Sequence, residues 1–290
     1  MAELGLDELD TARVYGAGQS EAALGAALGP LRSAVTCPFV ATKVAPPLGY
    51  AATSLVALQA DCVDLFYLHS PDPDATIEET LRAVDEGHNA GKFNEFGLSN
   101  FTAGQVEQIV SHCRKHGIVQ PTVFQGSYHV LQRHQTEQEL LPVLRAHGIR
   151  FLAYSPLAGG LLTGKHHFGD VPTEGRYEGG AASRWGERWW KEELFLAIGE
   201  LQSECETHGV TLAAAAIRWA VIHSALGPEH GDAVILGASS VAQLASNAEH
   251  SRAGPLPPQL VEFMDALADS PRVRGAVPPI SSKRMCAGPS

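Results

Sequence analysis

Short apolar stretches alternate with longer amphipathic stretches along most of this chain of 290 residues. The short stretches carry few polar positions, which is typical of strands buried on both faces. Several longer stretches begin with Thr and end in Gly, residue types that favour the two ends of a helix. We therefore expect helices between strands, and the strands are predicted over 7–10, 38–43, 62–69, 94–99, 121–125, 150–155 and 232–237.

This regular alternation predicts an α/β fold in which helices cover a parallel sheet. The order shows no reversal, which favours a (β/α)8 TIM barrel over an open sheet. Seven strands are predicted, and the first begins close to the start of the sequence, so we expect the first strand-helix unit of the barrel to be lacking. The crossover between Lys43 and Asp61 is also short, with only "ATSLVALQA" available for a helix.

The domain boundaries are predicted at the points where this alternation of strands and helices stops. Residues 1–270 are expected to form a single barrel domain, interrupted by a loop insert at about 163–191 that is rich in Gly, His, Arg and Trp. This insert has two interpretations, a loop over the site or a surface loop packed on the barrel. It contains Arg176, Tyr177, Arg184, Arg188 and three tryptophans. Residues 271–290 have the composition of a disordered tail.

Composition narrows the class of partner. The formal net charge of −11 disfavours nucleic acid and anionic membranes as partners. Five scattered cysteines without a Cys-x-x-Cys pair indicate thiols in a reducing compartment. The acidic N-terminus is unlike a signal peptide, and no apolar run reaches the ~18 residues of a membrane span. We expect a soluble, cytoplasmic protein.

Polar residues stand where the predicted strands end. The first six strands lead into Asp10, Lys43, His69, Ser99, Asn100, Gln125, Tyr154 and Ser155, and Ala238, Ser239 and Ser240 follow the last strand. In a parallel barrel these ends converge on the face that carries active sites. Taken singly, each residue has an ordinary explanation as a cap, a turn residue or a lysine reaching solvent. Their shared position predicts a functional site.

Four ionisable side chains, those of Asp10, Tyr15, Lys43 and His69, suit the reduction of a carbonyl. Tyr15 follows Asp10 by five residues, and an ammonium beside it, from Lys43, lowers a phenol pKa from its usual value near ~10. Asp10 would hold Lys43 in place, and His69 would orient the substrate oxygen. That oxygen gains negative charge as hydride arrives and then needs a proton.

The hydride needs a cofactor, because side chains do not donate one. Ser99, Asn100 and Gln125 offer amide and hydroxyl groups for a nicotinamide carboxamide, and Tyr154 offers a ring to stack on it. The segment "GASSVAQLASN" after the last strand places small residues before a helix N-terminus, which suits a phosphate. An ordinary strand-turn-helix with serine caps explains the same pattern.

Several motifs in the same order resemble the aldo-keto reductases, and within them the aflatoxin-aldehyde reductase branch, family 7. They are "LDTARVYGAGQSE", "VATKVAP", "DLFYLHSPD", "GKFNEFGLSNF", "PTVFQGSYHVLQR", "AYSPLAGGLLTGK" and "DAVILGASSVAQLASN", spread over roughly residues 7–265. The resemblance implies a (β/α)8 barrel that reduces aldehydes and some ketones with NADPH. It places the catalytic residues on Asp10, Tyr15, Lys43 and His69.

The resemblance also implies a set of cofactor contacts. They fall on Asp10, Ser99, Asn100, Gln125, Tyr154, Ser155, Pro156, Leu157, Gly159, Gly160, Leu161, Gly164, Lys165, Ala238, Ser239, Ser240, Gln243 and Asn247. It implies a small aldehyde as substrate, a homodimer as the assembly this branch tends to form, and no metal. The 239–247 loop lacks the Arg or Lys that usually meets a 2′-phosphate, so its hydroxyls and amides would serve.

Two departures from the family pattern keep other functions open. The sequence lacks nearly all of the family's first strand and helix, and Lys43 to His69 is shorter by about a helix. One alternative is therefore a catalytically impaired relative that binds NADP(H) or acts as a partner subunit. A metal-dependent barrel hydrolase using Asp10 and His69 is a third possibility, which the lack of a second His or carboxylate cluster disfavours.

Overall fold

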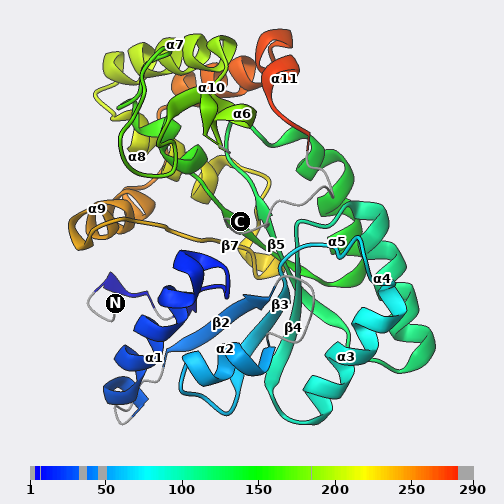
Figure 1. Cartoon of the computed structure of the whole chain (residues 1–290). Helices are drawn as coiled ribbons and strands as arrows, with labels where there is room; N and C mark the ends of the chain where they lie inside the picture. The colour runs from blue at the N-terminus through cyan, green and yellow to red at the C-terminus, as the bar shows by residue number, and fades with distance from the viewer. Residues whose placement is uncertain (1–3, 7, 33–37, 45–50, 184, 280–290) are drawn as a thin grey trace. The chain divides into compact units, whose positions relative to one another are not determined.

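A computed structural model describes residues 4–6, 8–32, 38–44, 51–183 and 185–279. Its strands are parallel and form one sheet in which each is a neighbour of the next along the chain (Figure 1). They are β1 (Glu8–Asp10), β2 (Phe39–Val44), β3 (Val63–Leu68), β4 (Phe93–Ser99), β5 (Pro121–Ser127), β6 (Arg150–Tyr154) and β7 (Ala233–Val234). Each predicted strand is present among the described residues.

Helices separate the strands, as the sequence predicts. The helices are α1 (Gln19–Arg32), α2 (Ala51–Ala57), α3 (Ile77–Asn89), α4 (Ala103–His116), α5 (Leu141–His147), α6 (Gly186–Trp189), α7 (Glu192–Thr207), α8 (Leu212–Arg218), α9 (Val241–Arg252), α10 (Pro258–Asp269) and α11 (Pro271–Ala276). The expected Thr caps are present: Thr76 and Thr102 form capping boxes at the starts of α3 and α4. The helix in the short crossover, α2, has only seven residues.

The chain divides into two compact units. Unit 1 comprises Met1–Gly126, Glu139–Phe151 and Ile280–Ser290, and unit 2 comprises Ser127–Gln138 and Leu152–Pro279. Unit 1 contains β1 to β4 together with helices α1 to α5, and unit 2 contains β7 with helices α6 to α11.

The core of unit 1 forms around its strands. Leu65 of β3 and Phe96 and Leu98 of β4 are fully buried. The register aligns Lys43 with Tyr67 and Tyr67 with Gly97 on three successive strands. Neighbours in register share a face of a sheet, so this row places a lysine, a tyrosine and a glycine together on one face.

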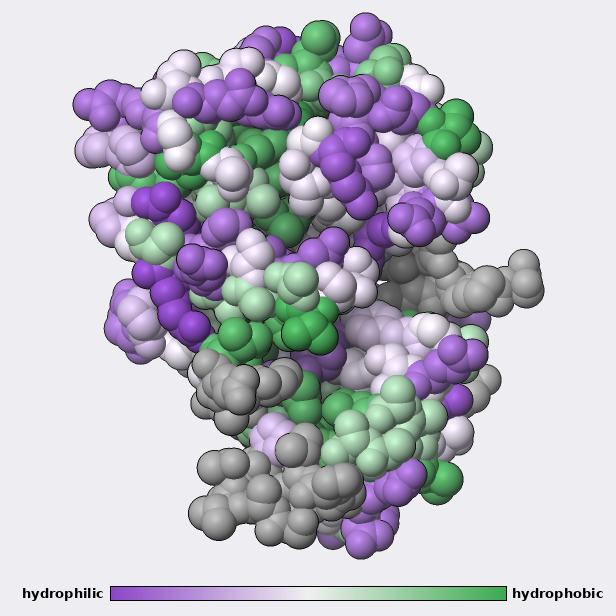
Figure 2. Space-filling view, turned by 90° about the vertical axis from the view of Figure 1, so that its left-hand side faces the viewer, coloured by the Kyte–Doolittle hydropathy of each residue, from purple (hydrophilic) through white to green (hydrophobic). Residues whose placement is uncertain are grey.

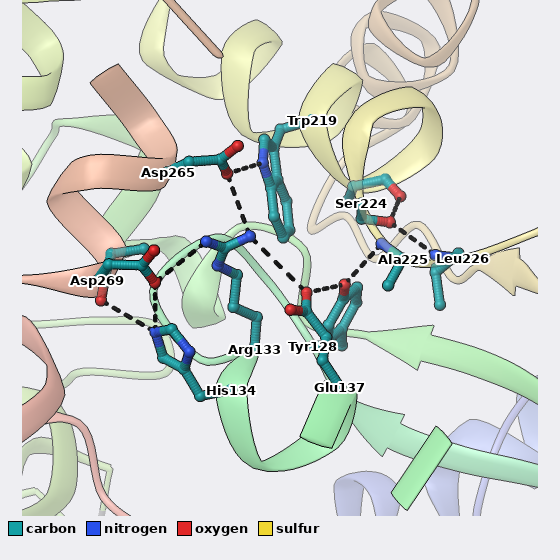
Figure 3. A network of polar contacts seen from close by, with 12 residues as sticks. Tyr128, Arg133, His134, Glu137, Trp219, Ser224, Ala225, Leu226, Asp265 and Asp269 are labelled. Atoms are coloured by element: carbon teal, nitrogen blue, oxygen red, sulfur yellow. Dashed lines mark hydrogen bonds and ion pairs between the residues drawn. The ribbon is translucent and has the colours of Figure 1, made fainter. Parts of the chain in front are cut away.

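Unit 2 is organised around helices. Helix α7 packs against α8, α10 and α11, and α8 packs against α9. The buried Trp219 lies in a polar network with Arg133, Asp265 and Asp269 (Figure 3). This network connects the segment after β5 to α10 within the unit.

Two segments differ from the sequence-based expectation. Strand β7 is shorter than predicted, although its backbone pairing continues with one bond from Ile235 N to Ala153 O at 2.8 Å. The predicted disordered tail begins with α11, because Ser270 caps its first turn and the side chains of Val273 and Ala276 are buried. Residues 280–290 lie outside the described residues.

Hydrophobic residues also reach the surface. The exposed large ones include Val56, Phe168, Leu196 and Val241. Figure 2 shows one face, on which apolar residues form separate patches among hydrophilic ones. Scattered exposure of this kind is common on folded proteins and by itself indicates no function.

Candidate active site

A short, tightly held loop carries Tyr15 away from the end of β1. The loop is fastened to β2 by backbone bonds from Thr11 N to Ala41 O and from Arg13 N to Lys43 O, each 2.9 Å long. Gly16 and Ala17 then adopt positive φ angles of 55° and 53°. This turn leaves the Tyr15 side chain 41% exposed, directly after the strand that delivers Asp10.

The ammonium of Lys43 is fully buried and bonds to the Asp10 carboxylate. It lies 5.3 Å from the ring centroid of Tyr15 and 5.5 Å from that of Tyr67. Two aromatic rings and one carboxylate thus surround the charge, an arrangement that stabilises a buried cation. The second oxygen of Asp10 accepts a bond of 2.8 Å from Gln125 Nε2.

His69 comes directly after β3 and faces Tyr15. The two ring centroids are 5.8 Å apart, and the ring planes are nearly perpendicular at 83°. Burial, and after it the positive charge of Lys43, together lower the pKa of His69 to about 3. The imidazole is therefore neutral at ordinary pH, with a proton available to a hydrogen bond.

Asn100 and Ser99 lie at the end of β4 beside His69. Asn100 has a φ of 63°, a backbone conformation that asparagine adopts more readily than most residues. Its side-chain Nδ2 donates to the His69 carbonyl oxygen at 2.9 Å and to Ser99 Oγ at 3.0 Å. Asn100 therefore supports the backbone that positions His69.

The structure brings seven of the predicted site residues together within unit 1. They are Asp10, Tyr15, Lys43, His69, Ser99, Asn100 and Gln125. A partly buried ion pair, a half-exposed phenol and a neutral imidazole meet here, so the cluster can bind an oxygen atom and supply a proton to it.

Two supporting residues were not predicted from the sequence. Tyr67 is fully buried against Lys43, and Glu21, also fully buried, accepts from Thr42 Oγ1 at 2.7 Å and from Arg13 Nη1 at 2.9 Å. The alternation of a strand contains the signal for Tyr67, because it lies two residues before His69 and so shares its face. No local pattern marks Glu21, whose partners depend on how α1 packs.

The predicted glycine-rich cofactor loop lies in unit 2. It covers Ser155, Pro156, Leu157, Gly159, Gly160, Leu161, Gly164 and Lys165, and the predicted stacking residue Tyr154 directly precedes it. Positive φ angles occur at Ser155, Gly159, Gly160 and Gly164, so the backbone turns repeatedly over this stretch. Glycine permits such turns and leaves room for a ligand close to the backbone.

The loop insert packs against this glycine-rich stretch inside unit 2. Tyr177 is buried and donates its hydroxyl to Ala158 O at 2.8 Å. Trp190, 5% exposed, lies 5.5 Å from Tyr177 and 4.8 Å from Phe195, measured between ring centroids. These contacts agree with the packed-loop interpretation of the insert, and Arg184 lies outside the described residues.

The last predicted cofactor segment, Ala238 to Asn247, forms the start of α9. Ser240 caps the helix by accepting from Gln243 N at 3.2 Å, and Gln243 Oε1 accepts from Ser239 N and Oγ at 2.9 and 2.8 Å. Asn247 Nδ2 donates to Gly237 O at 3.2 Å and thereby holds the turn before the helix. The segment therefore presents a well-ordered helix N-terminus.

Two other features are absent from the part of the chain that the structure describes. It contains no group of three or more His, Cys, Asp or Glu side chains arranged to hold a metal ion. None of its helices combines the length and apolar character needed to cross a membrane.

Comparison with known proteins identifies the family. The model of the aldo/keto reductase family matches residues 1–269. Aflatoxin B1 aldehyde reductase member 2 of Mus musculus is 44% identical over 284 residues, 91% of this chain and 76% of that protein. Aflatoxin B1 aldehyde reductase member 4 of Homo sapiens is 44% identical over 282 residues, 90% of this chain and 84% of that protein.

A solved structure shows the same fold. A thermostable aldo-keto reductase crystallised with the inhibitor epalrestat matches with a TM-score of 0.67 at 23% identity, over 92% of this chain and 84% of that one. The α/β fold and the family resemblance predicted from the sequence are both confirmed. The chain belongs to the aldo/keto reductase family of oxidoreductases.

Proposed function

We propose that this protein reduces aldehydes and some ketones to alcohols with NADPH, using Tyr15 as the proton donor. The observation that carries the proposal is the buried Lys43, paired with Asp10 and lying against Tyr15, which in turn faces His69. A nicotinamide cofactor would supply the hydride. The names of the mammalian relatives support an aldehyde as the substrate class.

Each residue of the cluster has a distinct task in this proposal. The neutral His69 donates a hydrogen bond to the substrate's carbonyl oxygen and orients it beside Tyr15. Tyr15 gives its phenolic proton to that oxygen as negative charge develops there. Lys43 stabilises the phenolate that remains, because an ammonium near a phenol favours its charged form. Asp10 holds Lys43 in position.

The residues present fit a nicotinamide dinucleotide. Ser99, Asn100 and Gln125 combine donors and acceptors of the kind that a carboxamide requires. In the structure, the Gln125 amide donates to Asp10, and its carbonyl oxygen can still accept a bond. We propose Tyr154 as the stacking surface for the ring and the stretch Ser155 to Lys165 as the cover over the phosphates.

The second phosphate site is proposed at the start of α9. A helix N-terminus attracts anions through its backbone N–H groups and its dipole. Ser239, Ser240, Gln243 and Asn247 would contact the adenosine 2′-phosphate of NADPH, with hydroxyls and amides in place of the usual Arg or Lys. We further propose a cytoplasmic homodimer, as in the related branch of the family.

The first experiment compares wild-type protein with Tyr15→Phe. We measure NADPH oxidation by its absorbance, with 4-nitrobenzaldehyde or succinic semialdehyde as the substrate. The substitution removes one hydroxyl from an exposed side chain, so we expect kcat to fall by about 10²- to 10⁴-fold while the protein stays folded. A parallel fluorescence titration should show unchanged NADPH affinity. Full turnover by the Tyr15→Phe variant would contradict the assignment of the acid.

A second candidate is binding of NADP(H) without turnover, as in a catalytically impaired relative or a partner subunit. It is favoured by the short helix α2 and by the seven strands found among the described residues. The same two measurements separate the candidates. Saturable NADPH binding by wild-type protein without aldehyde-dependent oxidation would support this second function.

A further inference from the structure

Unit 1 contains a cavity of about 700 Å³ on the other face of the strands that carry the candidate active site. Thr42 and Phe66 line it, and each is followed directly in its strand by a residue of the active-site face, Lys43 and Tyr67. Successive side chains of a strand point to opposite faces of the sheet. The cavity is therefore separate from the proposed catalytic cluster, and its size is that of a small-molecule site.

The inner walls of this cavity are aromatic and aliphatic. Phe66 and Phe93 stack at the inner wall with ring centroids 5.0 Å apart and ring planes inclined by 19°. Val63 and Val84 complete the buried wall. The hydroxyl of Thr42 donates to the buried carboxylate of Glu21, so it does not give its proton to the cavity. An occupant would meet mostly carbon.

Among the described residues, the covering helices leave space over the strands. Helix α2 has seven residues, about 10 Å of helix, whereas a six-residue strand such as β3 extends for about 20 Å. Helix α3 presents Ala83 and Gly87 to the cavity, four residues apart and hence on one face of the helix. Neither residue has a side chain large enough to fill it.

Charge at the rim is balanced. Asp61 and Lys92 are both exposed at the opening, with the neutral Gln59 beside them. Opposite charges at one opening give little preference for an anion or a cation. The wall and the rim together favour an uncharged occupant over a charged one.

We propose that this cavity is a binding site for a flat, uncharged aromatic molecule that packs against Phe66 and Phe93. Apolar cavities hold water poorly and readily accept apolar molecules of matching size. Aromatic rings add an attraction beyond simple burial when they stack on other rings. The site is independent of the proposed reductase chemistry, because it uses none of the residues assigned to that chemistry.

The test uses N-phenylnaphthylamine, an uncharged aromatic probe that fluoresces in apolar surroundings, titrated into the full chain. Wild-type protein should give a saturable increase in fluorescence. Ala83→Leu adds three carbon atoms at a lining position and narrows the cavity, so it should weaken probe binding at least tenfold. Arg82→Leu adds the same side chain at the neighbouring exposed position of α3, which does not line the cavity, and should leave binding unchanged.

Three outcomes would overturn the proposal: no saturable binding by wild-type protein, equal binding by the two leucine variants, or displacement of the probe by NADPH. Circular dichroism tests whether Ala83→Leu is folded. If it is not, Val56→Glu replaces it, since this charge at an exposed lining position should weaken binding to the same degree. Turnover is not part of the readout, so failure of the reductase assignment leaves this test intact.

Discussion

Each unit contains a polar cluster in which a cation lies beside a tyrosine and at least one carboxylate. The two clusters differ in how many carboxylates surround the cation and in how exposed the tyrosine is. In unit 1 the buried Lys43 meets the single carboxylate of Asp10. In unit 2 Arg133 meets Asp265 and Asp269 at 3.2 Å each and Glu137 at 3.9 Å, while Trp219 lies against the guanidinium (Figure 3).

The tyrosines show the difference most clearly. Tyr128 of the unit 2 cluster is fully buried, donates to Glu137 at 2.6 Å and accepts from Ala225 N at 3.0 Å. Its hydroxyl is thus used within the fold. Tyr15 is 41% exposed beside a buried ammonium and a neutral imidazole. An exposed phenol next to a buried charge is suited to chemistry, whereas a network of ion pairs and hydrogen bonds around a buried tyrosine is suited to joining elements.

The largest effect that would test this comparison is expected from Lys43→Met. The change removes the charge that stabilises the phenolate of Tyr15 and leaves Asp10 without its ammonium partner. We expect kcat for aldehyde reduction to fall at least about 100-fold. Steady-state kinetics measure this loss, and a urea melt on the same sample shows how much of it is unfolding. Near-normal turnover would place the chemistry elsewhere.

The matched change in unit 2 is Arg133→Leu. It removes one cation from three carboxylates and should lower the free energy of unfolding by about 1–3 kcal/mol. The kcat of the folded protein should stay within about twofold, since Arg133 contacts none of the proposed catalytic residues among the contacts described. Urea denaturation and turnover on one preparation measure both quantities. A large fall in kcat without destabilisation would contradict the structural role assigned to the unit 2 cluster.

The same contrast explains what the sequence could reveal. The apolar periodicity predicts the strands, and residues at strand ends meet at one edge by topology, so Asp10, Lys43 and His69 could be grouped in advance. The bonds from Gln125 to Asp10 and from Asn100 to His69 could not, because they depend on register and on one positive φ angle. The Arg133 network joins a loop to a distant helix, for which the sequence has no local signal.

The division into two units and the helix at the start of the tail also could not be predicted from the sequence pattern. Composition marks residues after Pro271 as disordered, yet a serine cap and two buried side chains are enough to form α11. The cavity beside α2 could be predicted from the sequence only in part. The short crossover was visible in the sequence, but the space it leaves depends on Ala83 and Gly87 of another helix.

The smallest predicted effect concerns a buried histidine of unit 2. Burial lowers the pKa of His129, as it does for His69, to about 3. An unfolded chain binds a proton at an ordinary histidine pKa of about 6.5, whereas the folded chain does not until about pH 3. The stability that this histidine contributes is therefore lost as pH falls through that window, by about 2 kcal/mol between pH 7 and pH 5.

His129→Leu should remove that dependence. We expect the fall in unfolding free energy between pH 7 and pH 5, from urea melts, to be about 2 kcal/mol smaller than in wild-type protein. Turnover should not change, because His129 contacts Trp189 in unit 2 and takes no part in the proposed chemistry. His116→Leu makes the same substitution at an exposed position of α4 and is the control for the replacement itself. An unchanged dependence in His129→Leu would mean that this imidazole has the same pKa in the folded and the unfolded protein. Burial alone would then not separate a catalytic histidine from a structural one, and the assignment of His69 would rest on its position facing Tyr15.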